Sequence, residues 1–260
     1  MNKKIKPTRS FDDLVKIMTI LRKECPWDRK QTHESIKDLM VEEVYEAIDA
    51  IDQQDFEELR KELGDLLLHV VFHSEMANET QQFDIEDVIY GIQEKLIRRH
   101  PHVFEDIDAD TSEKVARNWE AIKMREKGRE SVLGGVPRNL PALLRAQRMQ
   151  EKAAAVGFDW SEWEDVWAKL EEELQEFREA VQISDKEESK KEFGDLLFSL
   201  VNVGRFFDIE AEDSLRMTNN KFQDRFQYIE KKLAEKNLSL NDVTLKEMDV
   251  LWEEAKKTEA

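Results

Sequence analysis

The chain has 260 residues, of which 40% are hydrophobic and 38% are charged, and this length allows one domain or two around a substantial core. Only eight Gly and five Pro are present, and no convincing run of alternating β-branched residues occurs, so the composition favours long helices over a β-rich fold. The formal net charge of −18 repels polyanions and argues against DNA or RNA as the main partner.

The start of the chain and its cysteine content indicate a compartment. Residues 1–14 include basic side chains, but no apolar signal region follows, and no uninterrupted apolar run approaches the ~20 residues of a membrane span. The single cysteine, Cys25, excludes an intramolecular disulfide and is typical of a reducing environment; we interpret it as a small packing residue. We therefore expect a cytoplasmic protein with no membrane partner.

Four helices are predicted in the first half of the chain, over about residues 32–51, 56–78, 84–100 and 112–127. Thr32 is suited to cap the first helix, and the polar run 52–55 predicts a turn after it. Pro101 ends the third helix, because a proline ring disrupts a helix interior. On the second helix, an apolar stripe at helical spacing is predicted to face the core: Leu59, Leu63, Leu66 and Val70.

Two acidic pairs lie on the first two of these helices, each with both carboxylates on one face. Glu43 and Glu46 form the first pair, and Glu62 and Asp65 form the second. Both pairs lie ~14 Å from the intervening turn at ~1.5 Å of rise per residue, so a helical hairpin brings the four carboxylates to one level. Glu62 and Asp65 border the apolar stripe instead of lying opposite it.

Four clustered carboxylates repel one another, and a hard divalent cation relieves that repulsion with oxygen ligands. The absence of a paired Glu-x-x-His argues against a di-iron site. Ligation by carboxylates alone suits Mg²⁺, with Mn²⁺ as a possible substitute. The ordinary alternative is a solvated acidic helix face, because acidic residues at these spacings are common on helix surfaces.

The acidic pattern occurs twice, and this favours the metal cluster over the solvated face. A Glu-Glu-x-x-Glu segment, fifteen residues and then Glu-x-Gly-Asp-Leu-Leu begins at Glu42 and again at Glu172, 130 residues later. The segment between the copies, 128–141, is rich in Gly and Pro. We therefore predict two tandem domains, 8–127 and 142–260, joined by this linker.

Basic residues downstream of the acids also repeat. Two pairs each share a helix face at a spacing of four residues: Lys95 with Arg99, and Lys221 with Arg225. Such a pair near a metal cluster is suited to bind phosphate oxygens, and the alternative is a surface salt-bridge pair. Trp252 and Lys256 also share one face, and the tryptophan either stacks on a base or packs in the core.

With these motifs and their flanks, the sequence resembles the MazG nucleoside triphosphate pyrophosphohydrolases in their two-domain form. The flanks that carry the resemblance are "CPWDRKQTHESI" (25–36), "RRHPHVF" (98–104) and "KAAAVGFDW" (152–160), and the likeness covers nearly the whole chain. The resemblance implies an all-α fold and a homodimer in which helices of two subunits build each site. It also implies Mg²⁺-dependent hydrolysis of a broad range of NTPs and dNTPs between the α and β phosphates, which yields a nucleoside monophosphate and pyrophosphate.

The resemblance also assigns roles to residues of this sequence. The implied metal ligands are Glu173, Glu176, Glu192 and Asp195, with the equivalent first-copy set Glu43, Glu46, Glu62 and Asp65. The implied substrate-binding residues are Lys169, Glu172, Lys190, Lys191, Lys221, Arg225 and Trp252, with Lys256 a weaker candidate and Lys95 and Arg99 as first-copy equivalents.

A mechanism follows from these roles. Mg²⁺ ions neutralise phosphate oxygens and orient a water, and a carboxylate not fully committed to metal accepts its proton. Glu172 or Glu176 serves as this base, and Glu192 completes the catalytic set. Lys221 and Arg225 stabilise charge on the leaving pyrophosphate, so no covalent nucleophile is needed.

The two copies differ two turns past the aspartate, where Asn202 of the second copy corresponds to Phe72 of the first. Asn202 is able to bond a sugar or phosphate and Phe72 is not, so we expect the C-terminal copy to carry most catalysis. The N-terminal copy binds metal, helps dimerisation or regulates. His69 and His73 are interpreted as packed or surface residues rather than ligands.

A different class of function is also compatible with an acidic helical protein. A non-catalytic, metal-stabilised interaction module would show the same charge and the same long helices. It does not predict a Lys/Arg pair beside each acidic cluster, which an enzyme acting on phosphates does. The sequence does not distinguish between removal of damaged nucleotides (housecleaning of the nucleotide pool) and control of nucleotide-linked signalling.

Overall fold

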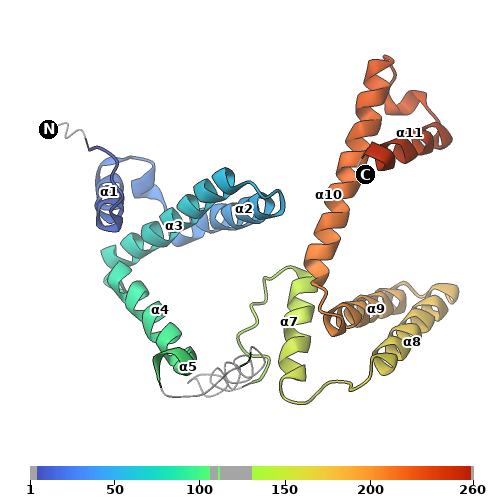
Figure 1. The fold of residues 1–260 in the computed structure, drawn as a ribbon, viewed down its shortest axis with the longest axis horizontal. Coiled ribbons are helices and arrows are strands. Elements are labelled where there is room, and N and C mark those ends of the chain that lie inside the picture. The colour runs from blue at the N-terminus through green and yellow to red at the C-terminus, as the bar shows by residue number, and fades with distance from the viewer. Residues whose placement is uncertain (1–4, 106–110, 112–130, 259–260) are drawn as a thin grey trace. The chain divides into compact units, whose positions relative to one another are not determined.

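The computed structural model describes residues 5–105, 111 and 131–258, and every regular element among them is a helix, so the predicted all-α class is confirmed. The chain divides into two compact units, Met1–Val115 (unit 1) and Ala116–Ala260 (unit 2), and Figure 1 shows the helices of each. The predicted boundaries at 8–127, 128–141 and 142–260 stay predictions. No helix in the described part of the chain is long and apolar enough to cross a membrane.

Unit 1 begins with a helix that was not predicted and continues with three that were. Its elements are α1 Phe11–Glu24, the 3-10 turn η1 Asp28–Lys30, α2 His33–Asp52, α3 Phe56–Glu79, α4 Ile85–Arg99 and the short α5 Pro101–Phe104. The predictions for α2, α3 and α4 are confirmed to within one residue at each end. The fourth predicted helix, at 112–127, lies outside the described residues.

Local chemistry sets the ends of these helices. Thr32 caps α2 by accepting a hydrogen bond from the Ser35 N–H in a capping box, as predicted. Between α2 and α3, Gln54 adopts a positive φ of 55°, and Asp55 then caps α3. α4 stops at Arg99, and Pro101 begins α5, where its missing N–H costs no helical hydrogen bond.

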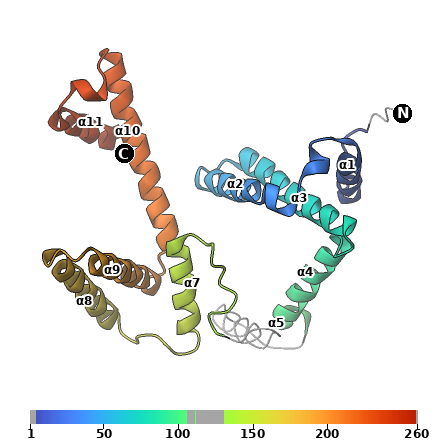
Figure 2. The same ribbon diagram turned by 180° about the vertical axis from the view of Figure 1, so that it is seen from behind.

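Unit 2 repeats the helical hairpin and adds a longer arm, formed by α10 and α11. Its elements are α7 Ala142–Ala154, α8 Trp163–Gln182, α9 Lys186–Phe206, α10 Ala211–Glu235, the 3-10 turn η2 Leu240–Asp242 and α11 Leu245–Thr258. The α8–α9 turn copies the α2–α3 turn, with Ser184 at a positive φ of 60° and Asp185 as the cap of α9. As Figure 2 shows from behind, α7 lies beside α9 and the start of α10, whereas α11 folds back on the other end of α10.

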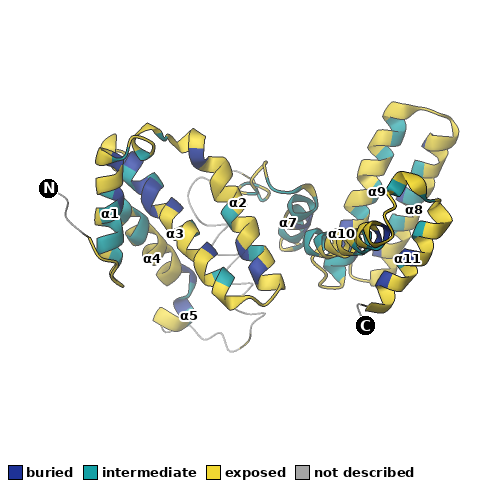
Figure 3. Ribbon diagram, turned by 90° about the horizontal axis from the view of Figure 1, so that it is seen from above, coloured by how far each residue is buried: buried dark blue, intermediate teal, exposed yellow. Residues whose placement is uncertain are grey.

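A cluster of buried hydrophobic side chains lies in each unit. In unit 1 the core cluster joins α1, the start of α2 and the C-terminal half of α3: Met18, Ile36, Val71, Phe72 and Met76. In unit 2 a cluster of Ile229, Leu233 and Leu251 fixes α11 on α10. Much of the two hairpins is therefore left at the surface, as Figure 3 shows in yellow.

The predicted core stripe on α3 was wrong, because none of its four residues is fully buried. Leu63 is 54% exposed and Val70 is 37% exposed, whereas Leu59 and Leu66 are only half-buried. The α3 residues of the unit 1 core cluster, Val71, Phe72 and Met76, all lie C-terminal to this stripe. The buried residue at this level is instead a carboxylic acid, Glu62.

Candidate active site

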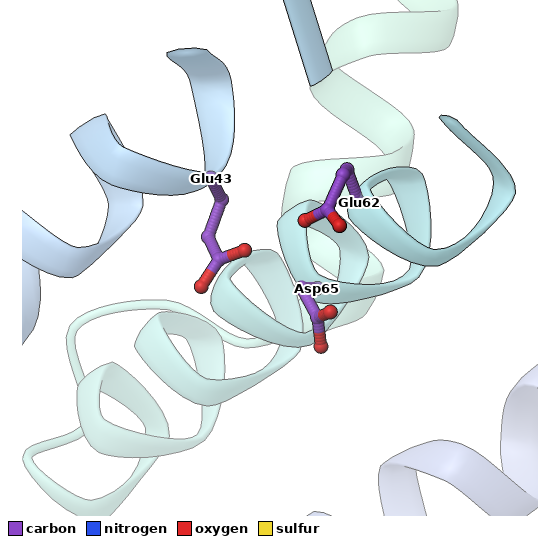
Figure 4. A group of neighbouring side chains, drawn as sticks. All are labelled: Glu43, Glu62 and Asp65. Atoms are coloured by element: carbon purple, nitrogen blue, oxygen red, sulfur yellow. The ribbon is translucent and has the colours of Figure 1, made fainter. Parts of the chain in front are cut away.

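Three carboxylates converge between the helices of the unit 1 hairpin. Glu43 reaches from α2 toward Glu62 and Asp65 on α3, as Figure 4 shows, and an oxygen of each lies within 4.8 Å of the others. Glu62 is 6% exposed, Glu43 is half-buried and Asp65 is exposed. The i, i+3 spacing on α3 puts Glu62 and Asp65 on one side of that helix, and the short turn puts Glu43 at the same level.

Unit 2 forms a matching group from the second copy of the motif. Glu173 and Glu176 of α8 lie within 4.8 Å of Glu192 of α9. Each unit thus brings together three of its four predicted ligands, but Glu46 is absent from the first group and Asp195 from the second. Both still act at close range, because Glu46 repels the charge on Glu62 and Asp195 repels the charge on Glu192.

The electrostatics of the clusters follow from burial and repulsion. Burial, and after it repulsion from Glu46, raises the pKa of Glu62 to about 7. Burial, and after it repulsion from Glu176, also raises the pKa of Glu192. Each hairpin therefore holds a carboxyl group whose pKa is raised by burial and by neighbouring carboxylates, and a bound cation would compensate that negative charge.

One basic side chain lies directly beside the unit 2 cluster. Lys169 of α8 forms ion pairs with Glu172 at 2.7 Å and Glu173 at 2.8 Å, and hydrogen bonds to these two carboxylates raise the pKa of Lys169. The residue 130 positions earlier in unit 1 is Leu39, which is exposed. Unit 1 therefore has no counterpart of this positive charge at the same place on its hairpin.

A pocket of about 330 Å³ lies beside the unit 2 carboxylates, between α7, the loop before α8, α8 and α9. It brings together four residues that were predicted from the sequence: Lys169, Glu173, Asp195 and Asn202. Its other lining residues include Gln150, Phe158, Trp160, Phe198 and Arg205, which were not predicted as site residues. The only sequence signal for them was the "GFDW" flank at 157–160, which contributes Phe158 and Trp160.

The polar wall of this pocket is held by contacts between distant segments. Arg205 donates two hydrogen bonds to Asp159, at 2.9 Å and 2.5 Å, and its Nε donates to Asn202 Oδ1 at 2.9 Å. Gln150 donates from Nε2 to the Phe198 carbonyl at 2.8 Å. Asn202 and Gln150 are each 7% exposed, so both amides are fixed in a largely desolvated wall.

The predicted basic and aromatic residues of α10 and α11 lie elsewhere in unit 2. Figure 1 shows α11 at the end of the 25-residue α10 that points away from α8 and α9. The Arg225 guanidinium stacks 5.4 Å from the Trp252 ring centre, and Trp252 packs against the α10–α11 core cluster. Within one chain, Lys221 and Arg225 are therefore not brought to the carboxylates.

The remaining predicted cations differ in their surroundings. Lys191 pairs with Glu188 at 2.9 Å, and Lys256 pairs with Glu253 at 2.6 Å. Lys190 lines an open apolar hollow at the α8–α9 turn with Phe177 and Phe193 among others. On α4 of unit 1, Lys95 is exposed and Arg99 is buried. Hydrogen bonding to Glu188, and to a smaller degree the charge of Glu192, raises the pKa of Lys191, but neither Lys190 nor Lys191 lines the pocket beside the carboxylates.

The two histidines of α3 pack against each other, and His73 also stacks on His33. His69 is buried, and the Nδ1 atom of His73 lies 2.7 Å from the Nδ1 atom of His33, with the two rings stacked. Burial, and after it the neighbouring His33, lowers the pKa of His73. Neither residue belongs to the carboxylate group of unit 1.

Comparison with known proteins matches both halves of the chain to one family. The MazG nucleotide pyrophosphohydrolase domain matches residues 31–104 and 162–229. A nucleoside triphosphate pyrophosphohydrolase/pyrophosphatase MazG of Thermotoga maritima is 47% identical over 250 residues, 95% of each chain. A nucleoside triphosphate pyrophosphohydrolase of Escherichia coli K12 is 43% identical over 259 residues, 96% of this chain and 98% of that protein. A solved structure of a MazG-related protein from Thermotoga maritima covers 44% of this chain and 99% of its own, with 24% identity and a TM-score of 0.40.

Proposed function

The chain belongs to the MazG nucleotide pyrophosphohydrolase family, with two MazG domains in tandem, and from this premise we propose that it hydrolyses nucleoside triphosphates to nucleoside monophosphates and pyrophosphate. The names of the two full-length relatives support the reaction. In this chain, the proposal is supported by the convergence of Glu173, Glu176 and Glu192 beside a pocket that Lys169 also lines. A purely structural helical hairpin has no need of such a combination.

The donor set fits a hard divalent cation, and Mg²⁺ is the proposed cofactor. All three converging ligands are carboxylates, and burial, followed by repulsion from Glu176 and other neighbouring carboxylates, raises the pKa of Glu192. Glu173, Glu176 and Glu192 would hold the ion, together with Asp195. When bound, the ion supplies neutralisation of phosphate oxygens and acidification of a bound water.

The chain's own residues perform the proton transfer and the positioning. A Glu of α8 takes the proton of the attacking water, and the two candidates are Glu172 and Glu176. Glu172 lies outside the converging group and is held by Lys169, whereas Glu176 is a member of that group. Glu→Gln substitution at each position separates the roles, because loss of a base lowers kcat with Mg²⁺ affinity unchanged, and loss of a ligand lowers both.

A homodimer is proposed to complete the site. Large apolar side chains are exposed along both hairpins, among them Val41 and Leu63 in unit 1 and Phe193 and Leu200 in unit 2. A second copy packed on these faces would bury them, and would bring a second α10 to the carboxylates. Lys221 and Arg225 of that second copy would then stabilise the leaving pyrophosphate. Sedimentation analysis tests this point, and a monomer at micromolar concentration would contradict it.

The C-terminal domain is proposed as the main catalytic copy, with a broad range of NTP and dNTP substrates. Lys169 and Asn202 line its pocket, and unit 1 has Leu39 and Phe72 at the equivalent positions. The net charge of −18 supports free nucleotides rather than nucleic acid polymers as partners. A nucleotide substrate and a single cysteine support a cytoplasmic role in housecleaning of the nucleotide pool.

The test is a product assay with the full chain, Mg²⁺ and a panel of canonical and altered NTPs, followed by phosphorus NMR. Release of pyrophosphate is the expected result. Release of orthophosphate would assign a different phosphatase reaction. No turnover of any NTP with Mg²⁺ or Mn²⁺ would favour the metal-stabilised interaction module and would contradict the proposal.

A further inference from the structure

The pocket of unit 2 is lined by both charged and aromatic side chains. The cluster residues Glu173 and Asp195 and the cation Lys169 line it, and so do the aromatic side chains of Phe158 and Trp160. Its volume of about 330 Å³ lies within the range of small-molecule sites, which is roughly 300–1,000 Å³. A ligand that carries phosphates and a flat ring matches this combination. The charged residues would bind the phosphates directly or through a cation, and aromatic side chains are able to stack on any nucleobase.

Gln150 lines this pocket and has an unused hydrogen-bond acceptor in its side chain. Its Nε2 group donates to the Phe198 carbonyl at 2.8 Å, and this bond fixes the orientation of the amide. Its Oε1 atom is buried and accepts no hydrogen bond from the described residues. A buried acceptor without a donor is costly, and such groups in native proteins usually have a specific reason.

Asn202 presents the complementary group. Its Oδ1 atom accepts from Arg205 Nε, and Arg205 is itself held by two hydrogen bonds to Asp159. With the oxygen occupied in this way, the Nδ2 group of Asn202 is the one left to donate in the pocket wall. The pocket wall therefore contains one side chain with an oriented acceptor and one with an oriented donor, and each of these side chains is 7% exposed.

We propose that this pocket takes the nucleoside part of the substrate, and that Gln150 is a specificity-determining residue whose Oε1 accepts a hydrogen bond from it. The donor on the ligand is either a base N–H or a sugar O–H, and Asn202 donates to an acceptor of the same nucleoside. The inference rests on the proposed function, because it assumes that a nucleoside triphosphate binds at the unit 2 carboxylates.

Unit 1 shows what the hairpin looks like without this pocket chemistry. At positions 130 residues earlier, Asn202 is replaced by Phe72, Ser199 by His69 and Lys169 by Leu39. Phe72 is buried in the unit 1 core and the Arg22 guanidinium lies over its ring at 5.6 Å. The donor that Asn202 supplies is therefore absent at the equivalent place, although the carboxylate pattern is retained.

Substrate analogues that each lack one donor test the inference. We would measure kcat/KM of the wild type for ATP, for purine riboside triphosphate, which lacks the exocyclic amino group, and for 2′-deoxy and 3′-deoxy ATP. We expect a loss of about tenfold or more for the analogue that lacks the donor to Gln150, because the buried acceptor is then left unpaired. The analogue that shows the loss identifies the base or the sugar as the source.

The Gln150→Leu variant then assigns the contact. We expect its kcat/KM for ATP to fall by about the same factor as the wild type loses on the sensitive analogue. Its kcat/KM for that analogue should then be no lower than its value for ATP. Gln147→Leu is the matched control: Gln147 is buried on the same helix, but its Oε1 accepts from the Ala211 N–H, its Nε2 donates to Glu151, and it does not line the pocket. Gln147→Leu should keep the wild-type ratio between ATP and the analogues.

The outcomes separate the inference from the proposed function. Equal kcat/KM of the wild type for ATP and all three analogues would overturn the inference, and this measurement needs no variant to fold. Undiminished discrimination in Gln150→Leu would also overturn it. In both cases pyrophosphate release would leave the proposed function intact, whereas a wild type that cleaves no NTP would overturn both.

Discussion

The two hairpins of this protein carry the same acidic motif, yet their surroundings differ. In unit 2 the carboxylates adjoin Lys169 and a pocket that reaches Asn202, and in unit 1 the equivalent positions hold Leu39 and Phe72. Phe72 joins the packed core between α1 and α3. The comparison teaches that a carboxylate cluster is a candidate metal site in either unit, but that it becomes a candidate substrate site only where the wall beside it is polar and open.

The largest expected difference comes from removing the same carboxylate in each copy. Glu192→Ala should lower kcat by about 10³-fold, because it removes a metal ligand of the proposed catalytic copy. Glu62→Ala should change kcat by less than about threefold. Steady-state pyrophosphate release by the two purified full-length variants measures both, and circular dichroism shows that each is folded. Equal loss in the two variants would defeat the assignment of catalysis to unit 2.

Mixing two inactive variants tests whether the unit 2 site is shared between subunits. Glu192→Ala and Arg225→Ala should each be nearly inactive alone. After joint unfolding and refolding, half of the dimers should be mixed and one of their two sites should be intact, so activity should return to about a quarter of the wild-type value. If Arg225 served the carboxylates of its own chain, the mixture would stay as inactive as its components.

A smaller effect is expected when the wall of unit 2 is made to resemble that of unit 1. Asn202→Phe replaces a buried amide with the residue found at the equivalent place in unit 1, and it also removes one of the two hydrogen-bond partners of Arg205, the other being Asp159. We expect kcat/KM for ATP to fall by about 10²-fold, with Mg²⁺ affinity retained, because the four acidic residues are untouched. Isothermal titration with Mg²⁺ provides the control, and an unchanged kcat/KM would remove Asn202 from the site.

The smallest expected effect is on stability and concerns unit 1. Glu62 has a pKa of about 7 against an ordinary value of 4.5, so the folded state binds its proton more tightly than the unfolded state does. Its contribution to stability is therefore complete below about pH 4.5 and is lost as the pH rises through about 7. In chelator, the midpoint of thermal unfolding should fall by a few degrees over this window.

Two controls sharpen this prediction. Glu62→Gln should abolish its part of the pH dependence, because the amide does not titrate. Added Mg²⁺ should restore the wild-type midpoint near pH 7, since an ion bound to the folded state stabilises it. If the midpoint of thermal unfolding changed with neither pH nor Mg²⁺, the unit 1 cluster would neither titrate nor bind the ion in this pH range.

The parts of the fold that depend on local chemistry were predictable from the sequence. The ends of α2, α3 and α4 follow from Thr32, the polar turn at 52–55 and Pro101, and each acts within a few residues of itself. The stripe through Leu63 was assigned to the core because its spacing is helical, but spacing does not reveal which face another helix will cover. That outcome is decided by packing between segments far apart in the sequence.

The candidate site divides in the same way. The acidic groups were predictable because i, i+3 spacing and a short turn bring them together, and the repeat at 130 residues doubled the signal. Gln150 and Arg205 gave no such signal, since their roles depend on contacts with Phe198 and Asp159 that lie 48 and 46 residues away in the chain. Lys221 and Arg225 were found from the repeat and the family resemblance, and neither source specifies which subunit's site they serve.

The most direct measurement of the central difference between the units is a crystal structure with Mg²⁺ and an ATP analogue whose α–β bridge is a methylene group. We predict Mg²⁺ at Glu173, Glu176 and Glu192, with the triphosphate beside Lys169 and the nucleoside in the pocket of unit 2. The same crystals should show no nucleotide at the unit 1 cluster. Nucleotide bound at Glu43 and Glu62, or unit 2 carboxylates turned to solvent with no ion between them, would contradict the account.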